Sequence, residues 1–267
     1  EVPPRPPNLC PGCPHRGVFY VLGKLGAFLS GDIGCYTLSF MKPLEGLHST
    51  VCMGASISMA HGMSKALKDK GKGKVVAVIG DSTFVHSGMT PLLNMAYNGS
   101  DAVVVICDNS TTAMTGMQEH PATGYTLQGQ PTKKLDFAAL AKVFGIENVR
   151  VVNPFDLKQV RKVMKDELAN PGPSVVIAES PCVLFRRANP AIGKPFRVDP
   201  DKCNGCKLCL GLSCSPISWR SFAKMAEGTY QKKTKTQEGI ALIDSVYCTG
   251  CTLCQQLCKA GAIVEEE

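Results

Sequence analysis

Two cysteine-dense stretches near the end of the chain constrain its fold more than any other feature of the sequence. Each has three cysteines at two-residue gaps and a fourth a few residues later. The stretches contain Cys203, Cys206, Cys209 and Cys214, and then Cys248, Cys251, Cys254 and Cys258. Soft thiolates prefer iron–sulfur cores, and a tight triple brings three sulfurs to three corners of one cubane. The sequence therefore predicts a small ferredoxin-like domain that holds two [4Fe–4S] clusters.

The fourth ligand of each cluster has to come from outside its own triple. In two-cluster ferredoxins, the distal cysteine of each run ligates the other cluster. The same crossing predicts that Cys258 completes the cluster of the first stretch and that Cys214 completes the cluster of the second. One departure from the ferredoxin pattern is that Lys259, not proline, follows Cys258, which affects the stiffness of the loop more than the ligation.

Other uses of so many cysteines fit the sequence less well. A disulfide scaffold is typical of small secreted proteins, whereas this chain has 267 residues and 14 cysteines, eight of them at metal-ligand spacing. Two structural zinc sites, the other alternative, favour separated pairs of cysteines rather than a triple and a single residue. The length itself suits one large domain and one smaller domain.

The formal net charge of +7 does not indicate a nucleic-acid partner. That value treats the cysteines as neutral, and two clusters with their thiolates contribute about −2 each, which brings the total to about +3. The basic run at residues 231–237, "QKKTKTQ", has one aromatic neighbour, Tyr230, and no nucleic-acid-binding motif. We expect a solvated loop there, with a docking patch for an acidic protein as the alternative.

The hydropathy and the first residues of the sequence indicate where the protein is located and whether it is part of a longer polypeptide. No apolar run is long enough to cross a bilayer, and the start lacks the basic end and apolar stretch of a signal peptide. We therefore expect a soluble, cytoplasmic protein with no membrane partner. The first residue is Glu1 and the opening is proline-rich, which is typical of a linker within a longer polypeptide.

The first two thirds of the chain alternate between strand and helix patterns. Short β-branched runs predict buried parallel strands at residues 74–80, 101–109 and 173–180. Helical periodicity predicts helices at residues 15–29, 53–68, 87–99, 135–145 and 155–170. This alternation predicts an α/β domain with a parallel sheet. A basic, loop-like stretch at residues 186–198 marks the boundary, so we expect domains at residues 1–190 and 191–267.

Polar residues follow two of these strands at the point where each strand ends. Gly80, Asp81 and Ser82 end the first, and Asn109 ends the next. Ligands of α/β proteins bind at this edge of a parallel sheet. A carboxylate, an amide oxygen and a nearby backbone carbonyl suit Mg²⁺ that holds a diphosphate. Together the two strand ends match the thiamine diphosphate motif, although each alone is weak.

Two loops upstream, "LCPGCPHRG" and "SGDIGCYTL", also predict ligand contacts. Gly12, Gly31 and Gly34 permit close approach of the backbone to a ligand, and both loops precede predicted helices. Cys10 and Cys13 form a C-x2-C pair, for which a zinc half-site and a redox pair are the alternatives. Three more cysteines, in apolar contexts, are expected to be packed thiols: Cys52, Cys107 and Cys182.

These motifs, in their order, resemble the 2-oxoacid:ferredoxin oxidoreductase family. The resemblance rests on "CPGCPHRG", "SGDIGCYTL", "CMGASI", "GDSTF" with "DNSTTAMTG", and the paired cysteine runs, so it spans essentially the whole chain. Within the family the closest match is the C-terminal half of the alpha subunit of the indolepyruvate-oxidising members. The resemblance implies that Asp81, Asn109 and the carbonyl of Thr111 hold Mg²⁺. It also implies that the diphosphate lies near Gly34, Cys35, Gly80, Ser82 and Thr115.

The resemblance further implies an activity and a set of partners. Members decarboxylate a 2-oxoacid oxidatively on thiamine diphosphate, pass the acyl group to coenzyme A and relay electrons one at a time through clusters to ferredoxin. They carry a pyrimidine-binding domain or subunit that supplies an activating glutamate. That segment is not found in this sequence, so we expect it from a preceding part of the polypeptide or from another subunit, in addition to a beta subunit.

Two histidines beside the candidate loops, His15 and His48, are candidates for contact with the diphosphate or the substrate. We expect His120 to be structural. Two competing functions are an electron-transfer module whose α/β domain only docks partners, and a non-oxidative thiamine-dependent decarboxylase. The second would have no use for the clusters, and the intact pair of Asp81 and Asn109 argues against the first.

Overall fold

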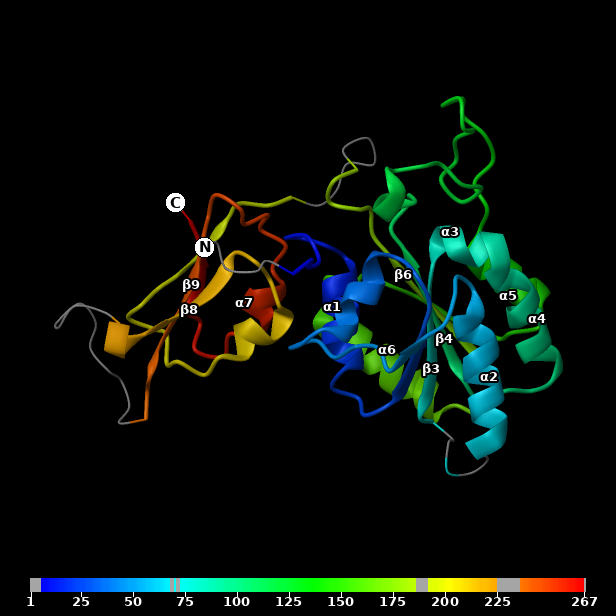
Figure 1. Ribbon diagram of the computed structural model, residues 1–267, viewed down its shortest axis with the longest axis horizontal. Coiled ribbons are helices and arrows are strands. Elements are labelled where there is room, and N and C mark those ends of the chain that lie inside the picture. The colour runs from blue at the N-terminus through cyan, green and yellow to red at the C-terminus, as the bar shows by residue number, and fades with distance from the viewer. Residues whose placement is uncertain (1–5, 68–69, 71–72, 186–191, 225–235, 267) are drawn as a thin grey trace.

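The computed structural model describes residues 6–67, 70, 73–185, 192–224 and 236–266. A larger part is built around a parallel sheet, and a smaller part contains the two cysteine stretches (Figure 1). Part of the predicted domain boundary, at residues 186–191, and most of the basic run at residues 231–237 lie outside the described residues.

The larger part contains a six-stranded, fully parallel sheet with the order β2-β1-β3-β4-β6-β5. Its strands are β1 (Phe28–Gly31), β2 (Ser49–Thr50), β3 (Val75–Gly80), β4 (Val103–Asp108), β5 (Asn148–Val152) and β6 (Ser174–Glu179). Every residue of β3 and β4 is buried, because helices cover both faces of the sheet, as all-parallel sheets require.

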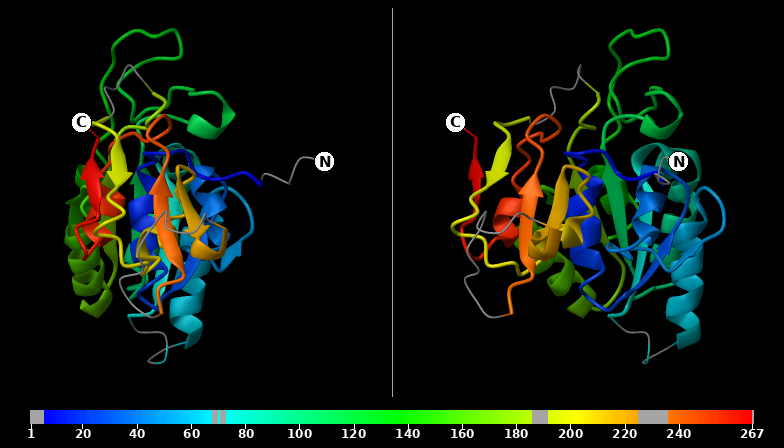
Figure 2. Two further views of the ribbon diagram at one scale, coloured as in Figure 1. Left: turned by 90° about the vertical axis from the view of Figure 1, so that its left-hand side faces the viewer. Right: turned by 60° about the vertical axis from the view of Figure 1, so that its left-hand side comes forward.

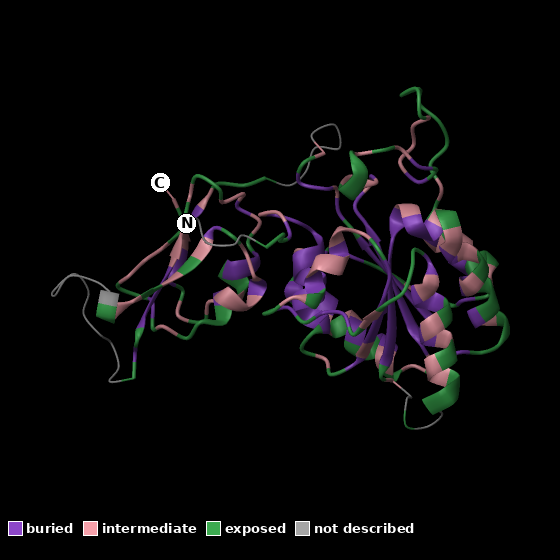
Figure 3. Ribbon diagram, in the orientation of Figure 1, coloured by how far each residue is buried: buried purple, intermediate pink, exposed green. Residues whose placement is uncertain are grey.

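Alternate residues along the central strands enter two separate cores. One core joins Val76, Val78, Val103 and Val105 to α1 (His15–Leu22) and α6 (Leu157–Ala169). The other core joins the intervening residues of β3 and β4 to α2 (Ala55–Leu67), α4 (Met89–Tyr97) and α5 (Phe137–Val143). The result is a layer of helices on each side of the sheet, with purple, buried strands between them (Figure 3).

Aspartates begin two of these helices. Asp136 accepts hydrogen bonds from the backbone N–H groups of Ala138 and Ala139 at 2.8 and 3.0 Å. Asp156 accepts one from Gln159 at 2.9 Å. Such caps satisfy N–H groups that have no partner within the helix and fix where each helix starts. Shorter helical segments complete this part: η1 (Cys35–Phe40), α3 (Asp81–Thr83), η3 (Phe84–Gly88) and η4 (Ala113–Thr115).

The smaller part consists of two antiparallel strand pairs and short helical turns. Strand β7 (Phe196–Val198) pairs with β10 (Ile263–Glu265), and β8 (Ile217–Ser221) pairs with β9 (Gly239–Ile243). The turns are η6 (Leu208–Leu212), η7 (Phe222–Lys224) and α7 (Leu253–Leu257). The cysteine stretches share a backbone device, because Lys207 and Thr252, each just after a second cysteine, both have left-handed φ angles of 60° and 67°.

Helix α1 joins the two parts. The core on its side of the sheet continues into Phe196, Leu212 and Leu253 of the smaller part, and Figure 2 shows the smaller part beside this helix. Gln256 of α7 accepts a hydrogen bond from the N–H of Leu157 at 3.0 Å and donates one to the carbonyl of Phe155 at 2.7 Å. The cysteine stretches are therefore packed on the sheet-bearing part rather than separated from it.

The parallel α/β architecture predicted from the sequence is confirmed, with local differences that include the unpredicted strand β2. The predicted helix at residues 15–29 ends at Leu22, and residues from Phe28 onward form strand β1. Glycines at 23 and 26 interrupt the helix, since glycine is a poor helix former. Strand β5 was not predicted, because it is an edge strand with the partly exposed sequence "NVRVV".

No helix among the described residues is long and apolar enough to cross a membrane.

The contact between α1 and its neighbours makes a testable prediction about Gly17. A Cβ atom there would collide with the backbone carbonyl of Pro154 and touch Leu253. We expect Gly17→Ala to lower the free energy of unfolding by about 1–3 kcal/mol, since backbone cannot retreat as a flexible side chain can. Thermal melts should show a lower Tm.

Gly62 provides the matched control. It also lies within a helix, but a Cβ there meets nothing within 4 Å. Gly62→Ala should raise the free energy of unfolding by about 0.5–1 kcal/mol. Equal effects of the two substitutions would show that the packing at Gly17 is not tight.

Candidate functional site

A cavity of about 520 Å³ opens at the carboxyl edge of the sheet, where β1, β3 and β4 end. The residues predicted to bind the cofactor all line it, and His15 joins them from α1. They are Gly34, Cys35, Gly80, Asp81, Ser82, Asn109, Thr111 and Thr115. These residues come from three separate segments of the sequence, and the parallel sheet brings them to one place.

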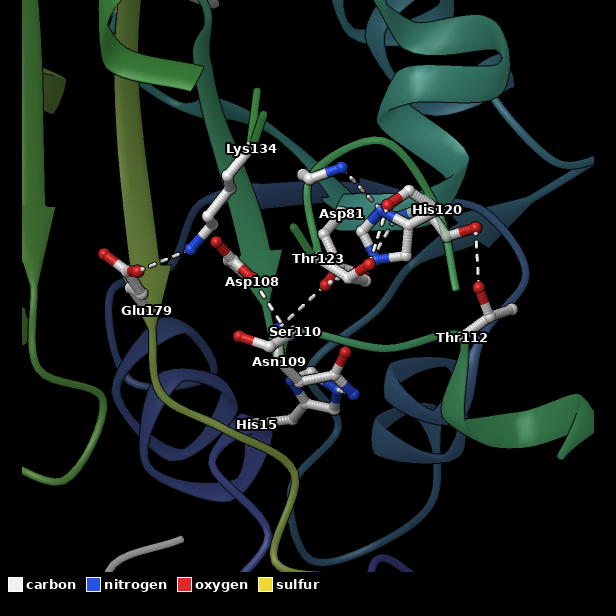
Figure 4. A network of polar contacts seen from close by, with 12 residues as sticks. His15, Asp81, Asp108, Asn109, Ser110, Thr112, His120, Thr123, Lys134 and Glu179 are labelled. Atoms are coloured by element: carbon white, nitrogen blue, oxygen red, sulfur yellow. Dashed lines mark hydrogen bonds and ion pairs between the residues drawn. The ribbon is translucent and has the colours of Figure 1, made fainter. Parts of the chain in front are cut away.

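Asp81 lies at the centre of the polar contacts in this cavity (Figure 4). Its side chain is almost completely buried. Oδ1 accepts a hydrogen bond from the N–H of Ser82 at 2.8 Å, and Oδ2 accepts one from the N–H of Asn109 at 3.2 Å. The two strand ends thus share one carboxylate, which fixes their positions relative to each other.

The side-chain amide of Asn109 faces two oxygen atoms. One of its terminal atoms lies 2.7 Å from the carbonyl oxygen of Thr111 and 3.3 Å from Oδ2 of Asp81. With nitrogen in that position, the amide donates to both oxygens. With oxygen there, three oxygen atoms converge with no proton between them, and a cation is then needed to hold them together. Carboxylate, amide and carbonyl oxygens are the ligands that Mg²⁺ prefers, so this donor set fits Mg²⁺.

His15 lies on the other side of the same amide. Its Nε2 is 3.5 Å from Nδ2 of Asn109, and burial lowers the pKa of the imidazole to about 4, with a smaller opposing effect of Asp81. The ring is therefore neutral near pH 7, and Nε2 can accept a hydrogen bond from an amide nitrogen. This contact favours the orientation of Asn109 that directs its oxygen toward Asp81 and Thr111.

His120 contacts Asp81 from the loop after η4, a role that the sequence did not predict. Its Nδ1 accepts a hydrogen bond from the N–H of Ala122 at 3.4 Å, and its Nε2 lies 3.3 Å from Oδ2 of Asp81. The ring proton is thus placed on Nε2, facing the carboxylate. Figure 4 shows one histidine beside each of the two oxygen-bearing side chains. Nothing in the sequence reveals this contact, since it depends on the fold of a loop.

His48, the other histidine predicted for the site, does not line the cavity. Its Nδ1 accepts a hydrogen bond from the N–H of Leu29 at 3.0 Å, and its ring stacks on Phe28 with centroids 5.3 Å apart. It therefore supports the backbone of β1. We do not include it in the proposed mechanism.

Two hydroxyl-bearing residues of the cavity have partners of their own. Ser82 Oγ accepts a hydrogen bond from Thr112 Oγ1 at 2.9 Å. Thr115 is exposed, and its Oγ1 donates to Gln118 Oε1 at 2.6 Å. The loop that carries Thr112 and Thr115 is thereby tied to the end of β3 and to itself.

The glycines predicted to admit a ligand instead make room for protein side chains. A Cβ at Gly34 or Gly80 would collide with the ring of Tyr36, and one at Gly31 would collide with Leu47. Gly12, at a left-handed φ of 72°, faces Thr249 of the second cysteine stretch. Gly34 and Gly80 line the cavity, but the tight constraint on them is the packing of Tyr36.

Asp32 is a buried carboxyl that the sequence did not single out. It accepts hydrogen bonds from the hydroxyl of Tyr36 and, at 3.0 Å, from the N–H of Gly54. Burial raises the pKa of Asp32 to about 7, against the opposing effect of the hydrogen bonds from Gly54 and Ser56. Because η1 and the loop before α2 both border the cavity, Asp32 connects two of its walls.

The cavity environment carries an excess of negative charge. Asp108, at the end of β4, is buried, and its pKa is raised to about 7 first by burial and then by the nearby charge of Asp81. Lys134, which opposes this shift, is paired with Glu179 at 3.2 Å. A cation bound by Asp81 would relieve this charge.

The eight cysteines of the two stretches line two small cavities. The outer quartet is formed by Cys203, Cys206, Cys209 and Cys258. The inner quartet, which adjoins α1, is formed by Cys214, Cys248, Cys251 and Cys254. The distal cysteine of each stretch thus lies with the triple of the other, in the crossed arrangement expected from the spacing.

The electrostatic surroundings of the thiols agree with this grouping. Burial raises the pKa of Cys209 to about 11, and Cys206, Cys203 and Cys258 add to the shift. Burial likewise raises the pKa of Cys214 to about 11, and there the neighbouring thiols are Cys251 and Cys248. No three His, Cys, Asp or Glu side chains within the described ranges are arranged to hold a single metal ion.

Backbone N–H groups point at sulfur in both quartets. Phe196 donates to Sγ of Cys248 at 3.3 Å, and Ala262 donates to Sγ of Cys258 at 3.2 Å. Such donors stabilise thiolate sulfur and are among the factors that tune iron–sulfur clusters.

A third group of cysteines is connected by the mutual electrostatic effects of its thiols, and one member, Cys35, lines the cavity. This α1 quartet consists of Cys10, Cys13, Cys35 and Cys182. Burial raises the pKa of Cys35, and the nearby thiols of Cys182 and Cys10 raise it further. Burial raises the pKa of Cys13 to about 12, and the thiols of Cys10 and Cys35 raise it by smaller amounts. Cys107 and Cys182 are buried, as expected of packed thiols, whereas Cys52 is exposed, contrary to expectation.

The part of the sequence that contains most of the cavity residues matches a known protein family. Residues 32–178 match the family described as "Thiamine pyrophosphate enzyme, C-terminal TPP binding domain", thiamine pyrophosphate being the same compound as thiamine diphosphate. The chain is 41% identical to the indolepyruvate oxidoreductase subunit IorA of Archaeoglobus fulgidus over 271 residues, and 41% identical to that of Pyrococcus abyssi over 279. The chain belongs to the 2-oxoacid:ferredoxin oxidoreductase family.

The extent of these matches differs between the chain and its relatives. The alignments cover 98% of this chain, but only 40% and 41% of the two relatives. The chain therefore spans less than half the length of the IorA subunits it matches. A solved 2-oxoglutarate:ferredoxin oxidoreductase from Magnetococcus marinus shares the fold, with a TM-score of 0.56 and 19% identity over 69% of this chain and 67% of that one.

The contact between His120 and Asp81 predicts an effect on metal binding in this family member. We expect His120→Leu to weaken Mn²⁺ binding in the presence of thiamine diphosphate by about tenfold, because an outer contact that orients a ligand is lost. His120→Gln should retain most of the affinity, since its amide N–H₂ can replace Nε2. Electron paramagnetic resonance titration of Mn²⁺ measures this directly.

The exposed His86 on η3 provides a control. His86→Leu should leave Mn²⁺ affinity unchanged. If His120→Leu bound Mn²⁺ as tightly as the unaltered protein, His120 would have no part in orienting Asp81.

Proposed function

We propose that the chain is the cofactor-binding and electron-transfer part of a coenzyme A-dependent 2-oxoacid:ferredoxin oxidoreductase, acting on indolepyruvate or another aryl pyruvate. The overall reaction converts a 2-oxoacid, coenzyme A and two oxidised ferredoxins into an acyl-CoA, CO₂, a proton and two reduced ferredoxins. The observation that carries the proposal is the meeting of Asp81, Asn109 and Thr111 at the sheet edge, next to cysteine quartets in the same chain.

The residues of the cavity have distinct proposed roles. Asp81, Asn109 and the carbonyl of Thr111 hold Mg²⁺, and His15 and His120 fix the orientation of the first two. The diphosphate lies against Gly34, Cys35, Gly80, Ser82 and Thr115, all of which line the cavity. When bound, thiamine diphosphate supplies the electron sink needed for decarboxylation of a 2-oxoacid. His15, neutral and at the cavity wall, keeps Asn109 aligned rather than exchanging protons.

The cysteine quartets are proposed to hold [4Fe–4S] clusters. Soft thiolates are the ligands such clusters require, and the outer and inner quartets each offer four around one cavity. Binding a cluster displaces the thiol protons that burial otherwise retains. The α1 quartet offers the same number of thiols, and we propose a third cluster there. Cys35 belongs to this quartet and also lines the cofactor cavity, so this cluster would be the first to accept an electron.

The domain division follows from these roles. We propose a thiamine diphosphate and Mg²⁺ domain at residues 1–190 and a two-cluster, ferredoxin-like domain at residues 191–267, both in the cytoplasm. An electron-transfer subunit whose α/β domain only docks partners is the alternative. The converging oxygens of Asp81, Asn109 and Thr111 favour the catalytic proposal, because a docking platform would not need them.

Several partners are needed to complete the reaction. A pyrimidine-binding domain or subunit supplies the activating glutamate, and a beta subunit and ferredoxin complete the assembly. The name of the IorA relatives includes the word "subunit", which supports a multi-subunit enzyme. Exposed apolar residues beside the cavity, among them Ile33, Met53 and Met114, suit contact with another protein surface.

Activity of the complete complex tests the proposed function. Under anaerobic conditions it should reduce ferredoxin with indolepyruvate and coenzyme A, and faster than with pyruvate or 2-oxoglutarate. Asp81→Ala should abolish this activity and thiamine diphosphate binding, while the iron content stays unchanged, because the carboxylate and the cysteines bind different groups.

Asp166→Ala, on the exposed face of α6, is the matched control and should keep full activity. Bleaching of the cluster absorbance only by an external reductant, and never by a 2-oxoacid with coenzyme A, would favour the electron-transfer alternative. Thiamine diphosphate binding by Asp81→Ala with unaltered affinity would show that the metal assignment is wrong.

The crossed quartets predict which cluster each distal cysteine serves. Cys258→Ala should perturb the cluster of the outer quartet, which is held mainly by the first stretch, and leave the magnetic signature of the inner one. Cys214→Ala should do the converse. Site-resolved paramagnetic NMR of the oxidised protein distinguishes the two, and uncrossed ligation would appear as the reverse pattern.

A further inference from the structure

Arg16 is a cation buried at the junction between the two parts of the molecule. Its side chain has an exposure of 0%. Nη1 donates hydrogen bonds to the carbonyl oxygens of Leu212 and Ser213 at 2.7 and 2.6 Å, and Nη2 donates to those of Leu9 and Cys10, the latter at 3.0 Å. These acceptors are all neutral, and Nε has no partner.

No carboxylate among the described residues forms an ion pair with Arg16. The ion pairs found within the described part of the chain do not include Arg16. The residue also lies in the first turn of α1, where the helix dipole is unfavourable to a cation. A buried, unpaired charge costs several kcal/mol, so buried cations are almost always paired with an anion. The position of Arg16 therefore requires an anion that the side-chain carboxylates do not supply.

Arg16 lies next to two of the cysteine groups. It lines the cavity of the inner quartet, and it contacts the backbone of Cys10 in the α1 quartet. The outer quartet has no such contact with Arg16 among its lining residues.

We propose that Arg16 is the shared counter-ion of the clusters held by the α1 quartet and the inner quartet, and that its charge raises their reduction potentials. This inference rests on the proposed function, because it requires clusters at both quartets. A cubane with four thiolates is anionic, and one-electron reduction adds a further negative charge. A fixed cation nearby stabilises the reduced form more than the oxidised form. The electron comes from the 2-oxoacid and passes onward to ferredoxin.

The hydrogen bonds of Arg16 also clamp the N-terminal loop to residues 212–213, so a purely structural role has to be separated from an electrostatic one. Arg16→Lys keeps the charge but loses the forked geometry. Arg16→Gln loses the charge but can still donate to a carbonyl oxygen. Lys162→Gln removes an exposed cation on α6 and is the control for a nonspecific change in net charge.

The test is a redox titration of the complete complex, followed by electron paramagnetic resonance, after iron analysis. In Arg16→Gln with full iron content, the reduced-to-oxidised ratio of the α1 and inner clusters at fixed ambient potential should fall about tenfold, or about 59 mV for a one-electron couple. The outer cluster should shift less, and Arg16→Lys and Lys162→Gln should stay near the unaltered protein. Unchanged potentials in Arg16→Gln, or equal shifts in Arg16→Gln and Arg16→Lys, would overturn the proposal.

If Arg16→Gln fails to take up iron, the iron content of Arg16→Lys tests the proposal instead. Full iron uptake by Arg16→Lys would then show that the charge is required, which supports the counter-ion role. Failure of both variants would show that the forked geometry matters instead, which overturns it. Absence of cluster signals from the unaltered complex would contradict the proposed function itself and is distinguishable from either result.

Discussion

The packing of α1 between the parallel sheet and the cysteine-rich part is the contact on which the rest of the structure depends. Successive residues of a helix point about 100° apart, so one turn can serve several sites at once. In the first turn of α1, His15 faces Asn109 at the sheet edge, Arg16 faces the smaller part, and Gly17 lies against the backbone of Pro154. Cys13, two residues earlier, belongs to the α1 quartet. The short sequence "CPHRG" thus positions the cofactor cavity, the thiols and the junction between the two parts.

Burial of charge is the common feature of these sites. Asp81 is buried with only N–H donors and His120 near it, and Asp108 lies close enough to raise the local negative charge. Arg16 is buried with carbonyl groups alone. In a low-dielectric interior, each arrangement is costly unless a charge of opposite sign is added. Mg²⁺ at the first and anionic clusters at the second would each supply that charge.

The sequence predicts well those features that depend on local spacing or on strand ends. Asp81 and Asn109 could be placed together because parallel strands that are adjacent in a sheet present their carboxyl ends at one edge. The crossed grouping of Cys214 and Cys258 could be expected because a triple of cysteines with two-residue gaps cannot complete a cubane alone. In both cases a general rule of structure connects residues that are distant in sequence.

Features that depend on loop paths or on packing between parts could not be predicted. His120 reaches Asp81 only because its loop folds back over the sheet edge, and Cys182 is placed by a hydrogen bond of 2.9 Å from its N–H to the carbonyl of Asn109. The packing of side chains against the predicted glycines could not be foreseen for a related reason. A Cβ atom at Gly34 would collide with Tyr36, and one at Gly31 would collide with Leu47. Both side chains are close in sequence to the glycine they contact, yet no pattern in the sequence shows where they point.

The groups of thiols also form a series that begins at the cofactor cavity and ends at the outer quartet. Cys35 lines the cofactor cavity and belongs to the α1 quartet, and Cys10 of that quartet contacts Arg16, which lines the inner quartet. Cys254 of the inner quartet is in turn affected by Cys209 of the outer one. With clusters at all three, each step of an electron from the cavity outward would join neighbouring groups, and the path would leave through the part of the chain farthest from the sheet. The cation at Arg16 would then lie at the second of these steps, between the α1 quartet and the inner quartet.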